Sequence, residues 1–396
     1  MEGELLRFAL PDGRPATLLL GPASTVLAVE DEIVSSWDLA GRPYALVLES
    51  GTYRRALDGR LLHKREATKD GPRLRRRLTP EEGEPAVEAA RREADAALRV
   101  LGHNDEAARR LGRVTAMGLR ALREDAARFL SVCGRVGILP PDQYLSLVVR
   151  VTEGCSWNAC TFCGFYRDVP FRWKTAEELA AHTAALRAFF GESIALRSSV
   201  FLGDANALCL AHEKLRPLVA SVAREFPDRP LASFVDAWTG RGKTADEYRE
   251  YARLGLRRVY VGLETGDPEL LAWLEKAGTP EDAVELADAL HEASVDVGVI
   301  VLLGAGGERF FGSHVTATAD VLGRMRLGPR DFLYFSELVD DPGLEYGRRS
   351  AGAPDLAPLP PERCAEQRGA ILGAIRWVDP AHPPRVATYD IREFVY

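Results

Sequence analysis

The stretch that decides the fold class is Leu145-Ser146-Leu147-Val148-Val149-Arg150-Val151, followed directly by residues 152–166, TEGCSWNACTFCGFY. Its first seven residues are mostly apolar at consecutive positions, as expected for a strand that is buried on both faces of a parallel sheet. The loop behind it holds Cys155, Cys160 and Cys163 in the spacing C-x4-C-x2-C. A buried strand that ends in three thiols predicts an α/β fold with its chemistry at the carboxyl ends of the strands.

The order of strand, loop and helix repeats down to about residue 340. Apolar runs of strand length occur at 200–202, 231–235, 259–263, 297–303 and 332–335. Segments with helical periodicity lie between these runs. Six such units in series predict a partial (β/α)6 TIM-like barrel around a parallel sheet.

The rest of the chain has a different pattern on each side of this barrel. Residues 1–78 alternate short apolar runs with Gly and Pro turn signals, which is typical of a small β-rich module. Residues 79–140 are predicted as a helical linker, with Thr79 opening one helix and Asn104 capping a second. The barrel is assigned to residues 141–340, and a C-terminal helix and tail to residues 341–396.

Length and composition restrict the class of protein. The chain has 396 residues, 46% of them hydrophobic, and a formal net charge of −7. This composition is typical of a folded globular protein and not of a disordered one. No apolar stretch reaches the ~20 residues that span a bilayer, so we expect no membrane partner. The acidic start of the chain lacks the features of a secretory signal, which predicts a cytoplasmic location.

One short basic tract, Arg73-Leu74-Arg75-Arg76-Arg77, suggests contact with nucleic acid. On an acidic chain so short a run is more typical of a solvated linker. We therefore interpret it as a linker, and the charge balance argues against a nucleic acid partner. A small-molecule substrate is the expectation that remains.

The six cysteines, at 133, 155, 160, 163, 209 and 364, are too few to define a disulfide scaffold in a chain of this length. The three in the loop predict metal ligands, and the other three are interpreted as buried small hydrophobes. Three thiolates can hold three irons of a 4Fe-4S cluster and leave the fourth iron open. A structural zinc ion usually needs a fourth Cys or His, and the nearest downstream His182 lies in a predicted helix. Zinc stays open as an alternative.

With an aromatic residue directly before its last cysteine, this loop resembles the radical S-adenosylmethionine (SAM) superfamily. The resemblance covers about residues 145–335, although the commonest form of the motif has three residues between its first two cysteines and this chain has four. The segment 259–266, VYVGLETG, is similar to the branch with coproporphyrinogen-dehydrogenase-like and Elongator-like members. The resemblance implies that Cys155, Cys160 and Cys163 bind three irons, that SAM chelates the fourth, and that Phe162 packs near the adenine.

The ends of three later strands extend the resemblance to the cofactor. Gly203 and Asp204 follow the second strand, where the family has a turn that receives the methionyl amino group. By the same similarity Glu264 would accept hydrogen bonds from the ribose hydroxyls, and Leu303 and Gly304 match a turn that borders the adenine. Each of these features is weak evidence alone, but their positions after the corresponding strands make the set informative.

The resemblance implies an enzyme that cleaves SAM reductively at one 4Fe-4S cluster. The resulting 5′-deoxyadenosyl radical would take hydrogen from a substrate, which we expect to be a small molecule. A reductase, flavodoxin or ferredoxin would supply the electron. Two alternatives stay open: an RNA- or nucleotide-modifying radical SAM enzyme, and a non-catalytic iron-sulfur or zinc module. Whether SAM is consumed or regenerated is also open.

Polar residues at the strand ends are the candidates to face the substrate, namely Tyr166, Arg167, Asn206, Asp236 and Glu337. Arg167 could clamp a carboxylate or phosphate, although a salt bridge or a place at a helix start is an equal alternative. Asp236 could instead cap the segment that follows it. Trp157 and Trp173 are expected to cover the mouth of the site. The sequence assigns no general acid or base.

Overall fold

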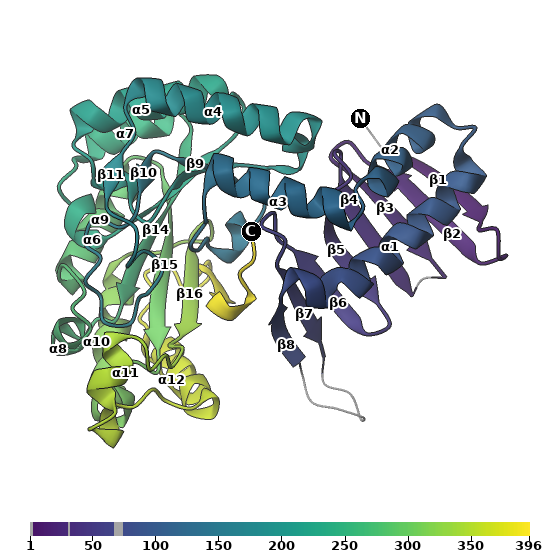
Figure 1. Cartoon of the computed structure of the whole chain (residues 1–396). Coiled ribbons are helices and arrows are strands. Elements are labelled where there is room, and N and C mark those ends of the chain that lie inside the picture. Colours follow the sequence, from purple (N-terminus) through teal and green to yellow (C-terminus); the bar gives the residue numbers. More distant parts are fainter. Residues whose placement is uncertain (1–2, 31, 67–73) are drawn as a thin grey trace. The chain divides into compact units, whose positions relative to one another are not determined.

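A computed structural model describes residues 3–30, 32–66 and 74–396. The chain folds into two compact units, whose helices and strands are labelled in Figure 1. Unit 1 comprises Met1–Leu147, His182–Ser198 and Arg392–Tyr396, and unit 2 comprises Val148–Ala181 and Ser199–Ile391. The module boundaries at residues 78, 140 and 340 stay predictions.

Unit 1 is built on an eight-stranded antiparallel sheet in which each strand pairs with the next one along the chain. The strands are β1 (Glu4–Ala9), β2 (Pro15–Leu20), β3 (Ser24–Val29), β4 (Ile33–Asp38), β5 (Pro43–Leu48), β6 (Gly51–Arg55), β7 (Leu61–Arg65) and β8 (Leu74–Leu78). This sheet forms because short apolar runs alternate with tight turns, and a meander of hairpins is the simplest way to pair them.

The basic tract is not a linker. Arg75, Arg76 and Arg77 lie on β8, where Arg76 pairs with His63 of β7, and Arg73 falls outside the described residues. The prediction failed because an edge strand is hydrogen-bonded on one side only, and its exposed positions tolerate charged side chains. The tract therefore carried no alternating apolar signal.

Unit 1 contains the helices α1 (Pro80–Leu101), α2 (Asp105–Ala116) and α3 (Leu119–Cys133), and also the later part of α4 (Ala176–Phe190). Thr79 opens α1 with a capping box to Glu82. The sequence predicts one helix from Asn104 to about residue 133, but the chain breaks at Met117 and Gly118, where the extended backbone of Gly118 starts a new helix.

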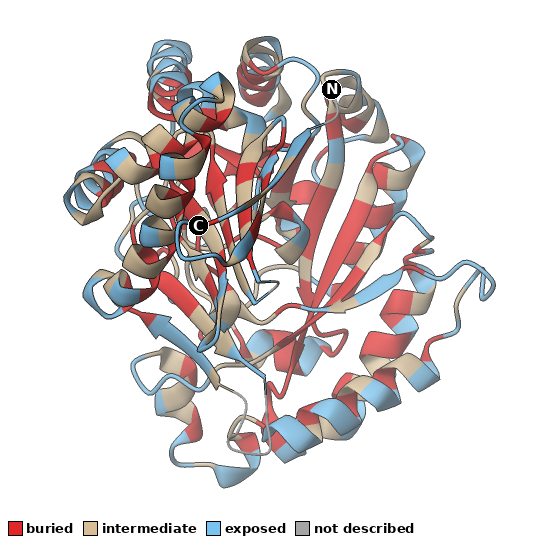
Figure 2. Ribbon diagram, turned by 90° about the vertical axis from the view of Figure 1, so that its right-hand side faces the viewer, coloured by how far each residue is buried: buried red, intermediate tan, exposed pale blue. Residues whose placement is uncertain are grey.

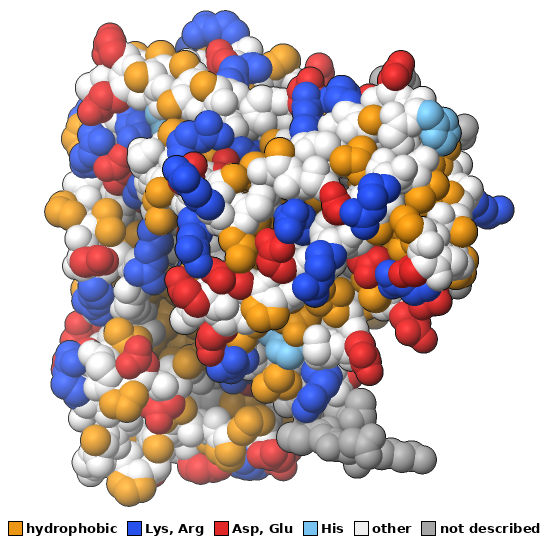
Figure 3. All heavy atoms as spheres, turned by 45° about the vertical axis from the view of Figure 1, so that its right-hand side comes forward, with side chains coloured by type: hydrophobic (Ala, Val, Ile, Leu, Met, Phe, Trp, Pro, Cys, Tyr) orange, Lys and Arg blue, Asp and Glu red, His pale blue; other side chains and the backbone are white. Residues whose placement is uncertain are grey.

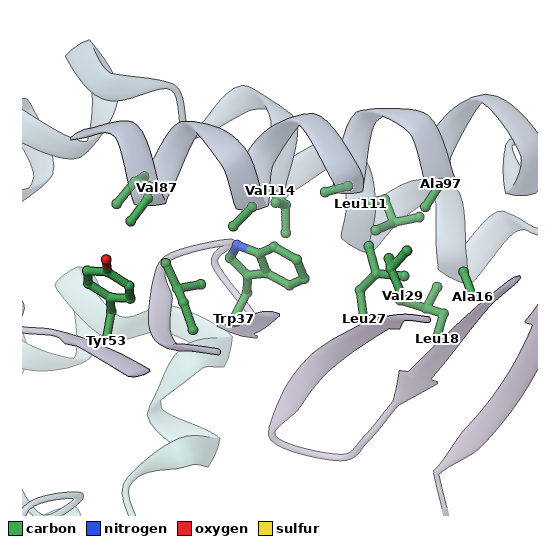
Figure 4. Packing of buried hydrophobic residues seen from close by; sticks show 14 of the residues in the cluster. Ala16, Leu18, Leu27, Val29, Trp37, Tyr53, Val87, Ala97, Leu111 and Val114 are labelled. Atoms are coloured by element: carbon green, nitrogen blue, oxygen red, sulfur yellow. The ribbon is translucent and has the colours of Figure 1, made fainter. Parts of the chain in front are cut away.

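The core of unit 1 lies between the sheet and these helices. Figure 4 shows side chains of α1 and α2 packed against the sheet, with Trp37 in the middle of the layer. Trp37, Leu18 and Leu27 are almost completely buried. Burial of this apolar surface is the main stabilising contribution to the unit.

Unit 2 is built on a seven-stranded sheet in the order β17-β16-β15-β14-β13-β12-β9, and all the described pairings between β12 and β17 are parallel. Its strands are β9 (Leu147–Arg150), β12 (Val200–Gly203), β13 (Leu231–Val235), β14 (Leu256–Glu264), β15 (Asp296–Leu303), β16 (Phe332–Glu337) and β17 (Arg385–Thr388). The central strands β15 and β16 are buried along most of their length. Figure 2 colours buried residues red, and many of these lie on strands. The predicted α/β class with a parallel barrel sheet is confirmed.

Helices follow the strands in alternation. They are α4 (Ala176–Phe190), α5 (His212–Glu225), α6 (Ala237–Gly240), α7 (Ala245–Arg253), α8 (Pro268–Trp273), α9 (Pro280–Glu292), α10 (Gly307–Arg324), α11 (Glu345–Ser350) and α12 (Pro361–Ala374). Single 3-10 turns and a small ribbon complete the structure, namely η1 (Pro141–Gln143), η2 (Gly191–Leu196), η3 (Ala207–Cys209), η4 (Pro354–Leu356), η5 (Ile391–Glu393), β10 (Thr152–Glu153) and β11 (Arg172–Trp173). No helix among the described residues is long and apolar enough to cross a bilayer.

The predicted number of barrel strands is one too low. The seventh strand, β17, lies in the segment that the sequence analysis assigns to a C-terminal helix and tail, and it pairs in parallel with β16. It is short and none of its four residues is buried. Such an edge strand has neither the length nor the apolar run that identifies the buried strands.

Leu18→Ala should destabilise unit 1 by about 2–5 kcal/mol, because Leu18 is fully buried and the change leaves a cavity. Leu19, the next residue on β2, is 37% exposed and serves as the matched control. We expect Leu19→Ala to cost less than about 1 kcal/mol. Urea unfolding followed by circular dichroism measures both changes, and equal costs would contradict the assigned orientation of β2.

Candidate functional site

The three loop cysteines lie at the carboxyl edge of the sheet in unit 2. They follow β9 and the short strand β10, and each is a free, partly buried thiol. The loop is fastened to other strand ends through its backbone, since Thr161 N donates to Leu274 O (2.9 Å) and Tyr346 N donates to Thr161 O (3.0 Å). The thiols therefore sit on a loop that is fixed at its centre.

Arg167 clamps the same loop from the other side. Its Nε donates to Cys163 O (3.0 Å), its Nη1 to Asn158 O (2.7 Å), and its Nη2 to the carbonyls of Ala159 and Cys160. A guanidinium has five N–H donors in a fixed plane and suits such a set of carbonyls. Arg167 thus holds the loop in shape. Its N–H donors are used for the loop carbonyls and not for a carboxylate or phosphate of a substrate.

Two residues of the loop have left-handed backbones. Gly154 has φ 74°, and a Cβ there would lie 2.6 Å from Val169 O. Asn158 has φ 50°, and its Nδ2 donates to Tyr166 O (2.9 Å). Glycine and asparagine are the residues that tolerate this conformation best, so the bends of the loop are built into its sequence.

The chemistry of the thiols fits a bound iron-sulfur group. Burial raises the pKa of Cys160 to about 12, and burial also raises the pKa of Cys163. Thiolates at these positions therefore need nearby positive charge, which iron supplies. No three His, Cys, Asp or Glu side chains in the described part of the chain converge as ligands of a single ion. A 4Fe-4S cubane does not require such convergence, because each of the three thiolates binds a different iron.

Asp204 is held by an arginine that the sequence analysis did not single out. The Nε of Arg150, at the end of β9, lies 2.9 and 3.0 Å from the two carboxylate oxygens, and Nη2 also donates to Oδ2. Gly154 N adds a hydrogen bond to Oδ2 (3.1 Å). Burial raises the pKa of Asp204 although Arg150 opposes this. The Arg150–Asp204 pair ties β9 to the turn at Gly203. Together with the bond from Gly154 N, it uses most of the hydrogen-bond acceptor capacity of Asp204.

Asn206 and Asp236 meet in one buried network. The Nδ2 of Asn206 donates to Asp236 Oδ2, to Thr239 Oγ1 (2.9 Å) and to Ser156 Oγ (3.4 Å). Asp236 caps α6, since its Oδ1 accepts from Thr239 N (3.0 Å). The buried Oδ1 of Asn206 has no partner within the described residues. An unpaired buried acceptor is costly, so this oxygen is available for a donor group of a ligand.

Glu264 ends β14 in a left-handed conformation with φ 61°. Its Oε1 lies 3.6 Å from the Nζ of Lys276. Burial raises the pKa of Glu264, whereas the Lys276 ammonium opposes this shift. A Cβ at Gly262 would lie 2.5 Å from Oε1, so glycine makes the space for the carboxylate. A strained acid in a pocket made by a glycine is typical of a functional site.

Lys276 is the main site residue that sequence reasoning missed. Burial lowers its pKa, but the Glu264 carboxylate outweighs this and the net shift is upward, with Cys160 and Asp236 adding to it. The available signal was the rarity of lysine, because only six occur among 51 basic residues. Where arginine is the usual cation, each retained lysine is a candidate for a position that needs a compact ammonium.

The glycine turn after β15 is backed by C-terminal elements. Gly304, with φ 80°, donates its N–H to Gln367 Oε1 (2.9 Å), and a Cβ there would approach Cys364 Sγ. Leu303 is buried, and its carbonyl accepts from Leu338 N (2.8 Å). Phe162 packs beside this turn in an apolar cluster, whose other members are Leu270, Trp273, Leu274, Leu302, Ala305, Phe310, Leu338 and Tyr346. The turn and Phe162 thus lie together, and their contact with adenine stays a prediction.

The remaining candidates have unequal exposure. Tyr166 is buried, and burial raises its pKa well above the usual value. Glu337 is partly buried at the end of β16. Trp157 is 40% exposed and makes an edge contact with the exposed Trp238, with ring centroids 5.8 Å apart. Trp238 was not anticipated because it is an isolated aromatic within a short helix.

His314 supports the segment that follows Glu264. Its Nδ1 lies 2.6 Å from Thr265 Oγ1 and 3.3 Å from Thr318 Oγ1. Burial lowers the pKa of His314 to about 4 although Asp267 opposes this. The imidazole is therefore neutral in the folded protein at neutral pH.

Comparison with known proteins places residues 149–309 in the Radical SAM superfamily, whose profile they match. Among curated proteins, none matches the chain in sequence. Solved structures that are similar include the radical SAM methyltransferase TsrM from Kitasatospora setae, at 16% identity and a TM-score of 0.45, covering 66% of this chain and 58% of that one. Coproporphyrinogen III oxidase from Escherichia coli has 16% identity and a TM-score of 0.43, covering 62% and 54%. The chain thus spans less than two thirds of the length of either protein.

Arg167→Lys should lower the iron bound after anaerobic reconstitution severalfold, because lysine cannot donate to four loop carbonyls at once. Arg253→Lys, at an exposed arginine of α7, is the control and should retain the iron content of the wild type. Iron and sulfide analysis with the visible spectrum measures the effect. Unchanged iron in Arg167→Lys would show that the clamp is dispensable.

The buried His314 should make stability depend on pH. Its pKa is lower in the folded state than the ~6.5 of an unfolded chain, so its contribution is present above pH 6.5 and is lost as the pH falls towards 4. His314→Asn keeps an acceptor near Thr265 but does not titrate. We expect the free energy of unfolding of the wild type to fall by about 2 kcal/mol more than that of the variant between pH 7 and pH 4.5. Parallel pH profiles would contradict this.

Proposed function

We propose that this chain, whose residues 149–309 form a radical SAM domain, uses one 4Fe-4S cluster to generate a radical from SAM and acts on a small molecule. The observation that supports this most is the loop with Cys155, Cys160 and Cys163, which is clamped by Arg167 at the sheet edge where Glu264 and the Gly304 turn also lie. When bound, the cluster and SAM supply reductive cleavage of the sulfonium bond and a 5′-deoxyadenosyl radical that takes hydrogen from the substrate.

In this proposal the thiolates of Cys155, Cys160 and Cys163 bind three irons of the cluster. Glu264 accepts from the ribose hydroxyls in the space that Gly262 leaves, and Lys276 favours the charged form of its carboxylate. Phe162 and the Gly304 turn border the adenine. The protein's own contribution is to orient the cofactor and to shield the radical from water.

Asp204 takes a modified role in the proposal. Because Arg150 and Gly154 N already occupy its oxygens, we propose that it fixes the turn at Gly203 and accepts from the methionyl amino group only through its remaining lone pair. The unpaired Oδ1 of Asn206 is then the better acceptor for an amino or hydroxyl group. Tyr166 and Glu337 stay candidates to face the substrate, and a reductase, flavodoxin or ferredoxin is the proposed electron donor.

The surface supports a small molecule more than a nucleic acid. On the face in Figure 3, basic and acidic side chains are interspersed. A nucleic acid site requires a basic stripe that neutralises phosphates, and the net charge of the chain is −7.

The experiment that tests the proposal is anaerobic. After cluster reconstitution and reduction with dithionite, the wild type should convert SAM to 5′-deoxyadenosine, and Cys160→Ala should form at most a few per cent of that amount because it lacks one iron ligand. Cys133→Ala, at a buried cysteine of α3, is the matched control and should retain the reaction. Product is quantified by chromatography with mass detection.

Equal 5′-deoxyadenosine from the wild type and Cys160→Ala would contradict the proposal. So would a wild type that carries a full cluster yet forms none of this product with any reductant tested.

A further inference from the structure

Unit 1 contains a cavity of about 440 Å³ that the radical site does not use. All of its lining residues belong to unit 1, and they come from β4 to β6, the turn η1, the end of η2 and the last two residues of the chain. Its volume lies in the range of ligand sites for small molecules. Four arginines line it, namely Arg42, Arg54, Arg55 and Arg197.

Within the described residues, Arg42 is the one lining arginine that forms ion pairs with carboxylates. Its Nε and Nη2 bind Asp125 at 2.7 and 3.0 Å, and its Nη1 lies 3.2 Å from Asp38. Two carboxylates thus face one guanidinium, and Arg128 Nη2 adds a hydrogen bond to Asp125 Oδ1 (3.1 Å), so this buried cluster needs no further anion. It accounts for Asp38, one of the two acidic residues in the lining, and the other, Asp142, accepts from Gln143 Nε2 (3.1 Å).

Arg54, Arg55 and Arg197 form no ion pair within the described residues. Arg55 donates one hydrogen bond, to Leu122 O (3.2 Å), and burial lowers its pKa to about 10. The guanidinium of Arg54 lies 4.7 Å from the ring centroid of Tyr144. Burial also lowers the pKa of Arg54, and nearby carboxylates oppose the shift for both residues, namely Glu393 for Arg54 and Asp125, Asp58 and Asp38 for Arg55. Both side chains line the cavity.

Arg197 is the least solvated of the three. It is only 5% exposed, and its buried Nε has no hydrogen-bond partner in the described part of the chain. Aromatic rings flank its guanidinium, with centroids 5.1 Å away in Phe190 and 5.4 Å away in Tyr396. Tyr396 also lines the cavity, and a main-chain oxygen of Tyr396 accepts from Leu57 N (2.9 Å). A buried donor without a partner is costly unless something binds to it.

We propose that this cavity binds a small molecule with a phosphate group, held by Arg54, Arg55 and Arg197. Guanidinium groups that make no direct ion pair, one of them with an unpaired buried Nε, suit a phosphate dianion, which accepts several hydrogen bonds at once. The tyrosine rings in the lining, such as Tyr44 and Tyr144, offer apolar surface to the rest of the ligand. The site is independent of the proposed radical chemistry.

The test is isothermal titration of the full chain with inorganic phosphate and with ribose 5-phosphate at constant ionic strength. Both lack adenine, so they do not compete for the proposed SAM site. The wild type should bind ribose 5-phosphate with one site per chain, and Arg197→Met and Arg54→Met should each weaken binding by at least about tenfold. Arg7→Met removes an exposed arginine of β1 in the same unit and should bind like the wild type.

Two substitutions keep the test decisive if one variant fails to fold, which circular dichroism detects. Arg197→Met removes a buried charge without leaving a partner unpaired, so we expect it to fold. Absence of binding by either phosphate compound up to 10 mM, about ten times a millimolar Kd, would overturn the proposal. If both arginine variants bound ribose 5-phosphate as tightly as the wild type, the proposal would also be overturned. The same holds if the wild type bound citrate more tightly than either phosphate compound.

Discussion

The strands of a parallel sheet all end at the same edge, and in unit 2 this constraint gathers the site from distant parts of the sequence. Asp204 follows β12, Asp236 follows β13, Glu264 ends β14 and Gly304 follows β15. None of them lies near the cysteine loop in sequence, yet each is placed beside the same edge by the direction of its strand. The loop itself adds what the sheet does not provide, which is three thiols on backbone that Arg167 and two left-handed residues hold in shape.

The parts of the structure that show a regular apolar pattern or a motif spacing in the sequence were predictable. Strands such as β15 are apolar at consecutive positions, and this pattern predicted the parallel sheet. The cysteine spacing predicted the loop and led to the superfamily, which the profile match confirms. The glycine turn after β15 was expected from the resemblance to the family, and the structure shows that a side chain at Gly304 would be obstructed.

Features that depend on tertiary contacts were not predictable. Arg167 was considered for a ligand, but only the folded loop shows that four backbone carbonyls occupy its donors. Lys276 lies in a turn after α8 without any motif, and its role depends on the approach to Glu264. The strands β8 and β17 are edge strands, so one lacks buried side chains over most of its length and the other over all of it. Local sequence carries little information about such positions.

The central claim is that the three thiolates leave one iron of the cluster open for SAM. Electron paramagnetic resonance of the dithionite-reduced, reconstituted protein, recorded with and without SAM, tests this directly. The account predicts that SAM changes the g-values of the reduced cluster, because the methionyl group binds the iron that lacks a cysteine ligand. An identical spectrum with saturating SAM would contradict the account, since it would mean that the cluster has no open iron.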